Sequence, residues 1–195
     1  MSTLKYGFIG EDDAQRIFLQ NYLKQVLPHF ELDVNFKIKA TNKKEVDVLF
    51  VEAVLEGFQR EGHQLFFVGR DLDDSQEKMY DQKMNDMLKK VPLKFQSQTI
   101  FFIPVQCIEH WLWYIKRNRE NPSETKNIEL EKKPRNEAKI AIYGFPKVST
   151  KTSNPIVEDL TNGFDIEWLS SRSKSFLNFH SQVKILNTQR TGVRY

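Results

Sequence analysis

Strand-like and helix-like segments alternate through the first 117 residues of this 195-residue chain. Short apolar runs end at Gly10, Ile38, Gly69 and Val105, and a longer stretch with apolar residues at helical spacing follows each of them. The run 63–69 (HQLFFVG) is continuous, which is typical of a parallel strand covered on both faces. The alternation therefore predicts an α/β fold with a mostly parallel four-stranded sheet flanked by helices.

The expected strands cover residues 4–10, 32–38, 63–69 and 97–105. Helices are expected over 12–27, from a Thr41 or Asn42 cap to about 62, after a Ser75 cap, and over 107–117. Asn154-Pro155 fits the cap and first turn of a short helix, residues 175–186 form a closing helix, and 188–195 have little pattern. The chain then reads as a single domain: a core over 1–117, a polar loop or insertion over 118–137, and a C-terminal extension over 138–195 that packs on the core.

Composition narrows the class of protein. Apolar residues make up 39% of the chain and include 15 Phe and 3 Trp, which argues against disorder. No apolar run approaches the roughly 18 residues of a membrane span, so no membrane partner is expected. The single cysteine, Cys107, cannot form an internal disulfide and is expected to be a small buried residue, which favours a cytoplasmic protein. The segment 116–195 holds 15 basic and 9 acidic residues, so it either contacts phosphates or forms a solvated surface.

Acidic side chains follow three of the predicted strands. Glu11 comes after the first strand, Asp71 and Asp73 come after the third, and Glu109 follows the fourth. Since ligands of open α/β sheets bind beyond the carboxyl ends of the strands, these side chains are expected to meet at one edge of the sheet. Asp71 and Asp73 are two apart in an extended stretch, so both carboxylates can approach one ion.

Carboxylates that meet in this way repel one another unless a cation neutralises them. Hard oxygen ligands select Mg²⁺, Mn²⁺ or Ca²⁺ over zinc, and the histidines and Cys107 show no zinc spacing. The sequence therefore predicts a Mg²⁺ or Mn²⁺ site formed by Glu11, Asp71 and Asp73. The alternative is that acids such as Asp12, Asp13 and Glu109 only start helices, where the helix dipole favours negative charge.

Two segments resemble the Toprim domain, which occurs in topoisomerases, bacterial primases and nucleases of the OLD and RloB types linked to phage defence. These segments are Gly7-Phe-Ile-Gly-Glu11 and Phe67-Val-Gly-Arg-Asp71-Leu-Asp73. The resemblance covers about residues 4–116. Two further segments, Ile108-Glu109-His110-Trp111-Leu112 and Ser173-Lys174-Ser175-Phe176, are similar to those of small stand-alone Toprim-like proteins.

The chain also departs from the family pattern. Asp12-Asp13 follows Glu11 where many members have glycine, so any of these three acids can be the counterpart of the family's glutamate. The chain holds no Gly-x-x-x-x-Gly-Lys-Ser/Thr loop of the kind that binds ATP. A separate ATPase protein encoded nearby is therefore an expected partner, unless the protein works without one. A homo-oligomer is left open.

The resemblance implies a Mg²⁺-dependent nuclease that hydrolyses phosphodiester bonds of nucleic acid in phage defence. Asp71 and Asp73 would hold the ion, and Glu11 would be a further ligand or a general base. Glu109 would bind a second cation or simply start its helix. Lys174 would stabilise charge on the phosphate, or be a solvated surface residue.

Two other functions compete with the nuclease. The first is a non-catalytic Toprim-like binding module that senses a metal or nucleotide or recruits an ATPase. The second is a nucleotidyl transferase or primase-like enzyme on the same fold, although the chain lacks obvious nucleotide-binding motifs. Two residues of the fourth helix allow either a structural or a functional role: His110 as a core residue or general base, and Trp111 as a core residue or a platform for a base.

Overall fold

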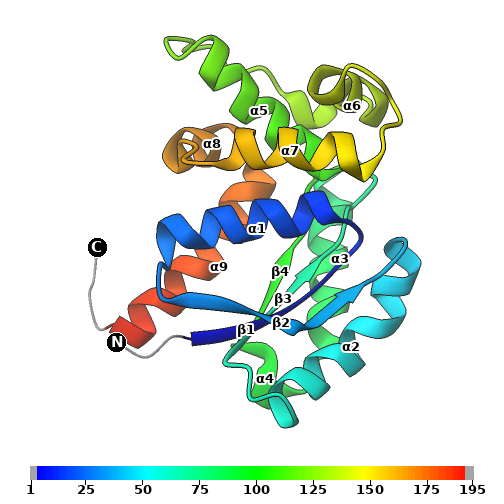
Figure 1. The fold of residues 1–195 in the computed structure, drawn as a ribbon, viewed down its shortest axis with the longest axis vertical. Coiled ribbons are helices and arrows are strands. Elements are labelled where there is room, and N and C mark those ends of the chain that lie inside the picture. The colour runs from blue at the N-terminus through cyan, green and yellow to red at the C-terminus, as the bar shows by residue number, and fades with distance from the viewer. Residues whose placement is uncertain (1–3, 192–195) are drawn as a thin grey trace.

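A four-stranded, all-parallel sheet forms the centre of the molecule in the computed structural model (Figure 1). The structure describes the backbone of residues 4–191 and leaves out the side chains of 36–39, 77 and 187–191. The strands lie in the order β2-β1-β3-β4. Their bounds are β1 Leu4–Gly10, β2 Phe30–Lys39, β3 Leu65–Gly69 and β4 Thr99–Phe102. The predicted α/β class with a parallel four-stranded sheet is confirmed.

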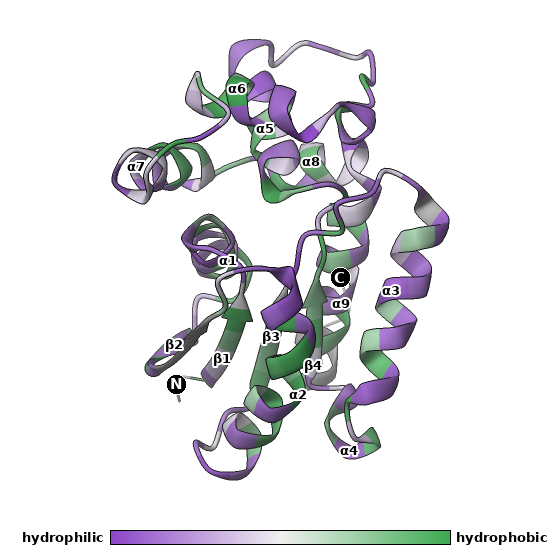
Figure 2. Ribbon diagram, turned by 90° about the vertical axis from the view of Figure 1, so that its right-hand side faces the viewer, coloured by the Kyte–Doolittle hydropathy of each residue, from purple (hydrophilic) through white to green (hydrophobic). Residues whose placement is uncertain are grey.

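Helices cover both faces of the sheet. On one face, α1 (Asp13–Val26) and α9 (Lys174–Thr191) pack on side chains such as Phe67 and Phe102. On the other face, α2 (Lys43–Gln59) and α3 (Glu77–Lys90) pack on Phe66 and Phe101, the alternate residues of the same strands. Figure 2 shows β3 and β4 as hydrophobic, whereas α3 carries both hydrophobic and hydrophilic residues. The difference arises because β3 and β4 are buried on both faces, whereas α3 is buried on one face.

The remaining helices are α4 Leu93–Gln96, α5 Ile108–Glu120, the 3₁₀ helix η1 Leu130–Lys132, α6 Arg135–Tyr143, α7 Thr150–Thr161 and α8 Ile166–Arg172. Figure 1 shows α5, α6, α7 and α8 gathered at one end of the molecule, with α2 and α4 towards the other. The C-terminal helices are joined to the core by contacts of α7 with α1 and of α9 with β4. Among the described residues, no helix has both the length and the apolar character needed to cross a membrane.

The free edge of β4 is covered by a side chain of α9. The carboxamide of Gln182 accepts from the backbone N–H of Phe101 at 3.1 Å and donates to its C=O at 3.0 Å. These are the two groups that a fifth strand would bond, and an uncovered edge can pair with another chain. Gln182 therefore ends the sheet at β4 and docks α9 beside it.

Several helix starts differ from the sequence expectation. Of the two predicted caps of α2, Thr41 and Asn42, it is Asn42 that caps the helix, accepting from Lys44 N and Glu45 N. Ser75 does not cap α3, because the helix begins two residues later with Gln76 in the cap position and no side-chain cap bond. The predicted cap and first-turn pair Asn154-Pro155 lies inside α7, which begins at Thr150 because Ser149 already has the extended cap conformation.

The second strand is less regular than its alternating sequence predicts. Tyr6 pairs with Leu32, but Phe8 pairs with Lys37. The pairing register between β1 and β2 therefore shifts across residues 33–36 of β2. Val34, expected on the buried face with Leu32, is 67% exposed because it lies in this irregularity. Other predicted bounds also differ from the structure: of the predicted strand over 97–105, four residues form β4. The expected closing helix over 175–186 is part of α9. The same helix includes residues 188–191, for which no structure was predicted, and 192–195 lie outside the described residues.

Residues 118–137 hold more structure than a polar loop. Leu130 in η1 is buried, and its backbone N–H donates to the hydroxyl of Tyr114 at 2.8 Å. The C=O of Lys133 lies 2.9 Å from the Nε2 atom of His110. These contacts hold the polar segment against α5, and its last residues begin α6.

Candidate functional site

The carboxyl ends of β1 and β3 bring Glu11 and Asp71 together. The two strands are paired neighbours, so the residues that follow them lie side by side although they are sixty positions apart. The Oε1 atom of Glu11 accepts from the backbone N–H of Asp71 at 2.8 Å. The structure places the side chains of Glu11 and Asp71 together at one edge of the sheet, as predicted.

Gln15, in the first turn of α1, joins the same two strand ends. Its Oε1 atom accepts from the backbone N–H of Glu11 at 3.1 Å, and its Nε2 donates to Asp71 Oδ1 at 2.8 Å. Asp12 caps α1 by accepting from Gln15 N at 3.0 Å, which directs this first turn towards the sheet. Gln15 is fully buried, and it fixes Oδ1 of Asp71, which leaves Oδ2 for another partner.

A guanidinium group occupies the space between Asp71 and Asp73. Arg135, the first residue of α6, donates from Nη2 to Asp71 Oδ2 at 3.1 Å and from Nη1 to Asp73 Oδ1. Lys43 at the start of α2 pairs with the other oxygen of Asp73 at 2.7 Å. Asp71 and Asp73 therefore contact one guanidinium of the protein itself. The metal ion that the sequence predicts at this position stays a prediction.

The loop after β3 is also strained. Asp73 and Gln106 have positive φ angles of 57° and 64°, and among the described residues they are the two non-glycine residues that do. The backbone N–H of Asp73 donates to the C=O of Gln106 at 3.1 Å, so the two strained residues support each other at neighbouring strand ends. Such conformations cost of order 1–3 kcal/mol each and concentrate at functional sites.

Burial and mutual repulsion act together on these carboxyls. Burial raises the pKa of Asp71 well above its usual range, and the nearby Glu11, Asp12 and Glu109 raise it further, against the opposing effect of Arg135. Burial also raises the pKa of Glu11 to about 7, opposed by the hydrogen bond from Asp71 N. Both groups are thus more easily protonated than ordinary carboxyls, first because they are buried and second because other carboxyls lie near them.

Glu109 lies on the side of this cluster formed by α5 and α6. It is buried, its Oε1 atom is 3.7 Å from Lys139 Nζ, and its Oε2 atom has no hydrogen-bond partner. A cavity of about 390 Å³ is lined by Glu109 and Asp12 together with Lys139 and Lys147. The structure thus places Glu109, a predicted site residue, near enough to raise the pKa of Asp71, and it places open space and basic side chains next to Glu109.

Lys174 is placed elsewhere. It begins α9 and lines a second cavity of about 260 Å³ together with Tyr80, Glu131 and Ser175. The cation in contact with Asp71 and Asp73 is instead Arg135. Arg135 could not be identified from the sequence, because it stands in a segment where charged residues are common and nothing marks the one that folds over the strand ends.

The other residues of interest in α5 are core residues. Trp111 is fully buried and donates from Nε1 to the hydroxyl of Ser175 at 2.8 Å. His110 is also buried, and burial lowers its pKa, which is the direction expected of a neutral core imidazole. Cys107 is buried and unpaired, as expected. These positions are filled by packing, so the chemistry of the site rests on its carboxylates.

The donor set suits a hard divalent cation, but the present arrangement is not a finished ligand shell. In the described part of the chain, no three His, Cys, Asp or Glu side chains are grouped as a metal site. Asp71 Oδ2 and Asp73 Oδ1 point at one position, and Glu11 Oε1 is turned towards the backbone. A cation at that position would take the place of the guanidinium.

Comparison with known proteins adds no relatives. No family model, curated protein or solved structure matches this chain.

Proposed function

We propose that this protein is a Mg²⁺- or Mn²⁺-dependent nuclease of the Toprim type, which hydrolyses phosphodiester bonds in nucleic acid as part of a phage-defence system. One observation carries the proposal: Glu11, Asp71 and Asp73 meet at the ends of two paired parallel strands, where Asp71 and Asp73 share a single cation. The defence role rests on the sequence resemblance alone.

Asp71 and Asp73 would hold the metal, with Glu11 as a further ligand or the general base and Glu109 available for a second cation. The support is chemical: the oxygens are hard, two of them face one position, and Glu11, Asp12 and Glu109 add negative charge near the buried Asp71. When bound, the ion would polarise a phosphate oxygen and favour the attack of water on phosphorus.

Glu11 is the strongest candidate for the general base. Its pKa of about 7 lets it take a proton from water near neutral pH and release it afterwards. The hydrogen bond from Asp71 N fixes Oε1, which leaves Oε2 to accept the proton. Lys139 and Lys147 on the adjacent cavity can bind the backbone of the substrate through its phosphates. Lys174, on the second cavity, remains a candidate for stabilising phosphate charge.

A second function is favoured by a different observation. Arg135 and Lys43 already pair with Asp71 and Asp73, so the protein neutralises these carboxylates by itself. A binding module that recruits an ATPase, and that does not cut, would need no more than this. Either protein would fit a reducing cytoplasm, where a buried single thiol such as Cys107 stays unpaired.

Cleavage assays separate the two functions. Purified protein is incubated with plasmid, single-stranded DNA and RNA in Mg²⁺, in Mn²⁺ and in EDTA. The nuclease predicts metal-dependent cleavage that falls at least about 100-fold in Asp71→Asn and Glu11→Gln. Asp74→Asn is the matched control, because Asp74 lies in the same loop and its side chain accepts from Gln76 N, a bond that asparagine keeps. Equal cleavage in all variants, or none with any substrate in the presence of the neighbouring ATPase, would reject the nuclease.

A further inference from the structure

Arg135 makes the closest contacts with the two carboxylates proposed to hold the metal. Its guanidinium binds Asp71 Oδ2 and Asp73 Oδ1, which are the oxygens that point at a shared position. The side chain of Asp71 is 1% exposed, whereas that of Arg135 is 37% exposed. The guanidinium therefore lies on the solvent side of the carboxylates and can leave without opening the core.

A divalent cation and Arg135 cannot use these oxygens together. Both need the same lone pairs, and both are positively charged, so each lowers the affinity of the other for the site. Lys43 contacts the remaining oxygen of Asp73 and does not occupy the shared position. Binding of the metal thus requires the guanidinium to move.

The helix that carries Arg135 offers a destination for it. Arg135, Lys139 and Tyr143 are spaced by four residues on α6, so they share one face of the helix. Lys139 and Tyr143 line the 390 Å³ cavity, which Asp12 and Glu109 also line. A released guanidinium stays on this basic helix face, and its paired N–H groups match two phosphate oxygens.

We propose that Arg135 is a catalytic residue that exchanges partners: it holds Asp71 and Asp73 in the metal-free protein, and it binds the scissile phosphate once the metal has displaced it. This inference rests on the proposed nuclease function and adds the phosphate-binding group of its site. A purely structural Arg135 would only tie α6 to the sheet.

Other contacts already hold this segment in place. Leu130 is buried, Glu131 accepts from the hydroxyls of Ser173 and Ser175, and the C=O of Lys133 lies against His110. Removal of the guanidinium should therefore leave α6 docked. Thermal unfolding of Arg135→Gln, compared with wild type, checks this before any binding is measured.

The test measures two affinities with opposite expected changes. Mn²⁺ binding is followed by electron paramagnetic resonance titration, and binding of a labelled single-stranded DNA and of the same sequence as RNA is followed by anisotropy in Ca²⁺. Arg135→Gln should bind Mn²⁺ at least about tenfold more tightly, because a competing charge is gone. The same variant should bind the oligonucleotide at least about fivefold more weakly, because a charged phosphate contact is lost. Arg135→Lys should fall between it and wild type in both.

The outcomes distinguish this inference from the function beneath it. If wild type binds Mn²⁺ and loses it in Asp71→Asn, but Arg135→Gln leaves the Mn²⁺ or oligonucleotide affinity unchanged, the exchange is wrong and the metal site stands. A fall in both affinities would make Arg135 structural and would also overturn the exchange. If wild type binds no Mn²⁺, the exchange and the proposed nuclease fail together.

Discussion

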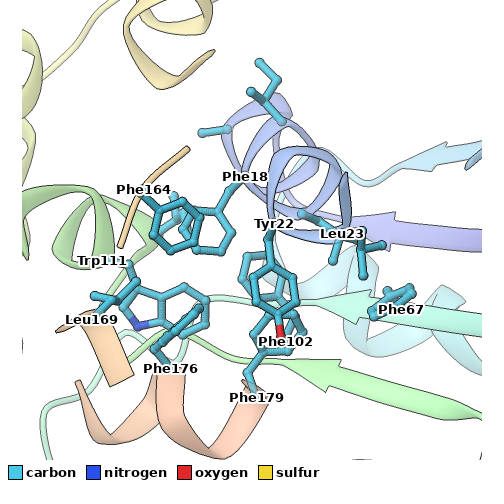
Figure 3. Packing of buried hydrophobic residues seen from close by; sticks show 14 of the residues in the cluster. Phe18, Tyr22, Leu23, Phe67, Phe102, Trp111, Phe164, Leu169, Phe176 and Phe179 are labelled. Atoms are coloured by element: carbon cyan, nitrogen blue, oxygen red, sulfur yellow. The ribbon is translucent and has the colours of Figure 1, made fainter. Parts of the chain in front are cut away.

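The aromatic cluster beneath α1 and the carboxylate cluster at the strand ends both adjoin the central sheet, but one gathers groups that attract each other and the other gathers groups that repel. In the aromatic cluster, the ring of Phe18 lies within 6.0 Å, between centroids, of Phe102, Trp111, Phe164 and Phe176 (Figure 3). These rings are buried from water, and the Trp111 N–H has its partner in Ser175. The contacts between these rings favour the folded state.

The carboxylate cluster gathers groups that repel each other. Glu11, Asp12 and Glu109 all raise the pKa of Asp71, and Asp73 adds a strained backbone next to them. Such an arrangement lowers the stability of the metal-free protein, so its presence requires another explanation. Substitutions in the aromatic cluster and in the carboxylate cluster should therefore change the free energy of unfolding with opposite sign.

The largest loss is expected in the aromatic cluster. Phe176→Ala removes a fully buried ring that contacts Phe18, Tyr22 and Trp111. We expect the free energy of unfolding to fall by about 3–5 kcal/mol, measured by urea denaturation. Leu177→Ala, the next residue but 43% exposed, is the control and should cost less than about 1 kcal/mol. Similar losses in the two variants would show that this cluster is not the core.

The carboxylate cluster should show the reverse sign in Glu11→Gln. The folded protein keeps the Glu11 proton up to a pKa of about 7, whereas the unfolded chain releases it near 4.5. Stability contributed by protonated Glu11 is therefore complete below 4.5 and is lost as the pH rises to about 7. Glutamine imitates the protonated form, so the variant should gain about 1–2 kcal/mol at pH 8 without metal.

The same variant should match wild type at pH 4.5, where Glu11 is protonated in the folded protein. Urea denaturation in EDTA at both pH values measures the difference. A loss of stability in the variant at pH 8 would contradict the interpretation that the ionised carboxylate of Glu11 destabilises the folded protein.

A smaller loss is expected where a polar contact supports the aromatic cluster. Ser175 accepts from the Trp111 N–H and donates to Glu131. Ser175→Ala leaves the buried indole N–H without its closest acceptor and should lower the free energy of unfolding by about 1–2 kcal/mol. Ser181→Ala, on the same helix but exposed, should change it by less than about 0.5 kcal/mol. Equal effects of the two serines would remove Ser175 from the support of the core.

Local patterns in the sequence were sufficient to predict the α/β class with its parallel sheet and the closeness of Glu11 and Asp71. Apolar runs marked the strands, Asn42 marked a helix start, and carboxylates directly after strand ends had to meet because parallel strands finish at one edge. Val34 was misplaced because alternation cannot show that a strand loses step with its neighbour. Arg135 was missed for a related reason: its partners are 62 and 64 residues away, and a charged segment looks the same whether it is solvated or folded over a site.

The most direct test of the account is a crystal structure soaked with saturating Mn²⁺ at pH 8, with anomalous scattering used to locate the ion. The account predicts a Mn²⁺ peak bound by Asp71 and Asp73, with Glu11 near it and Arg135 moved away from both aspartates. A well-ordered structure in which Arg135 still bridges Asp71 and Asp73, with no peak between them, would contradict it.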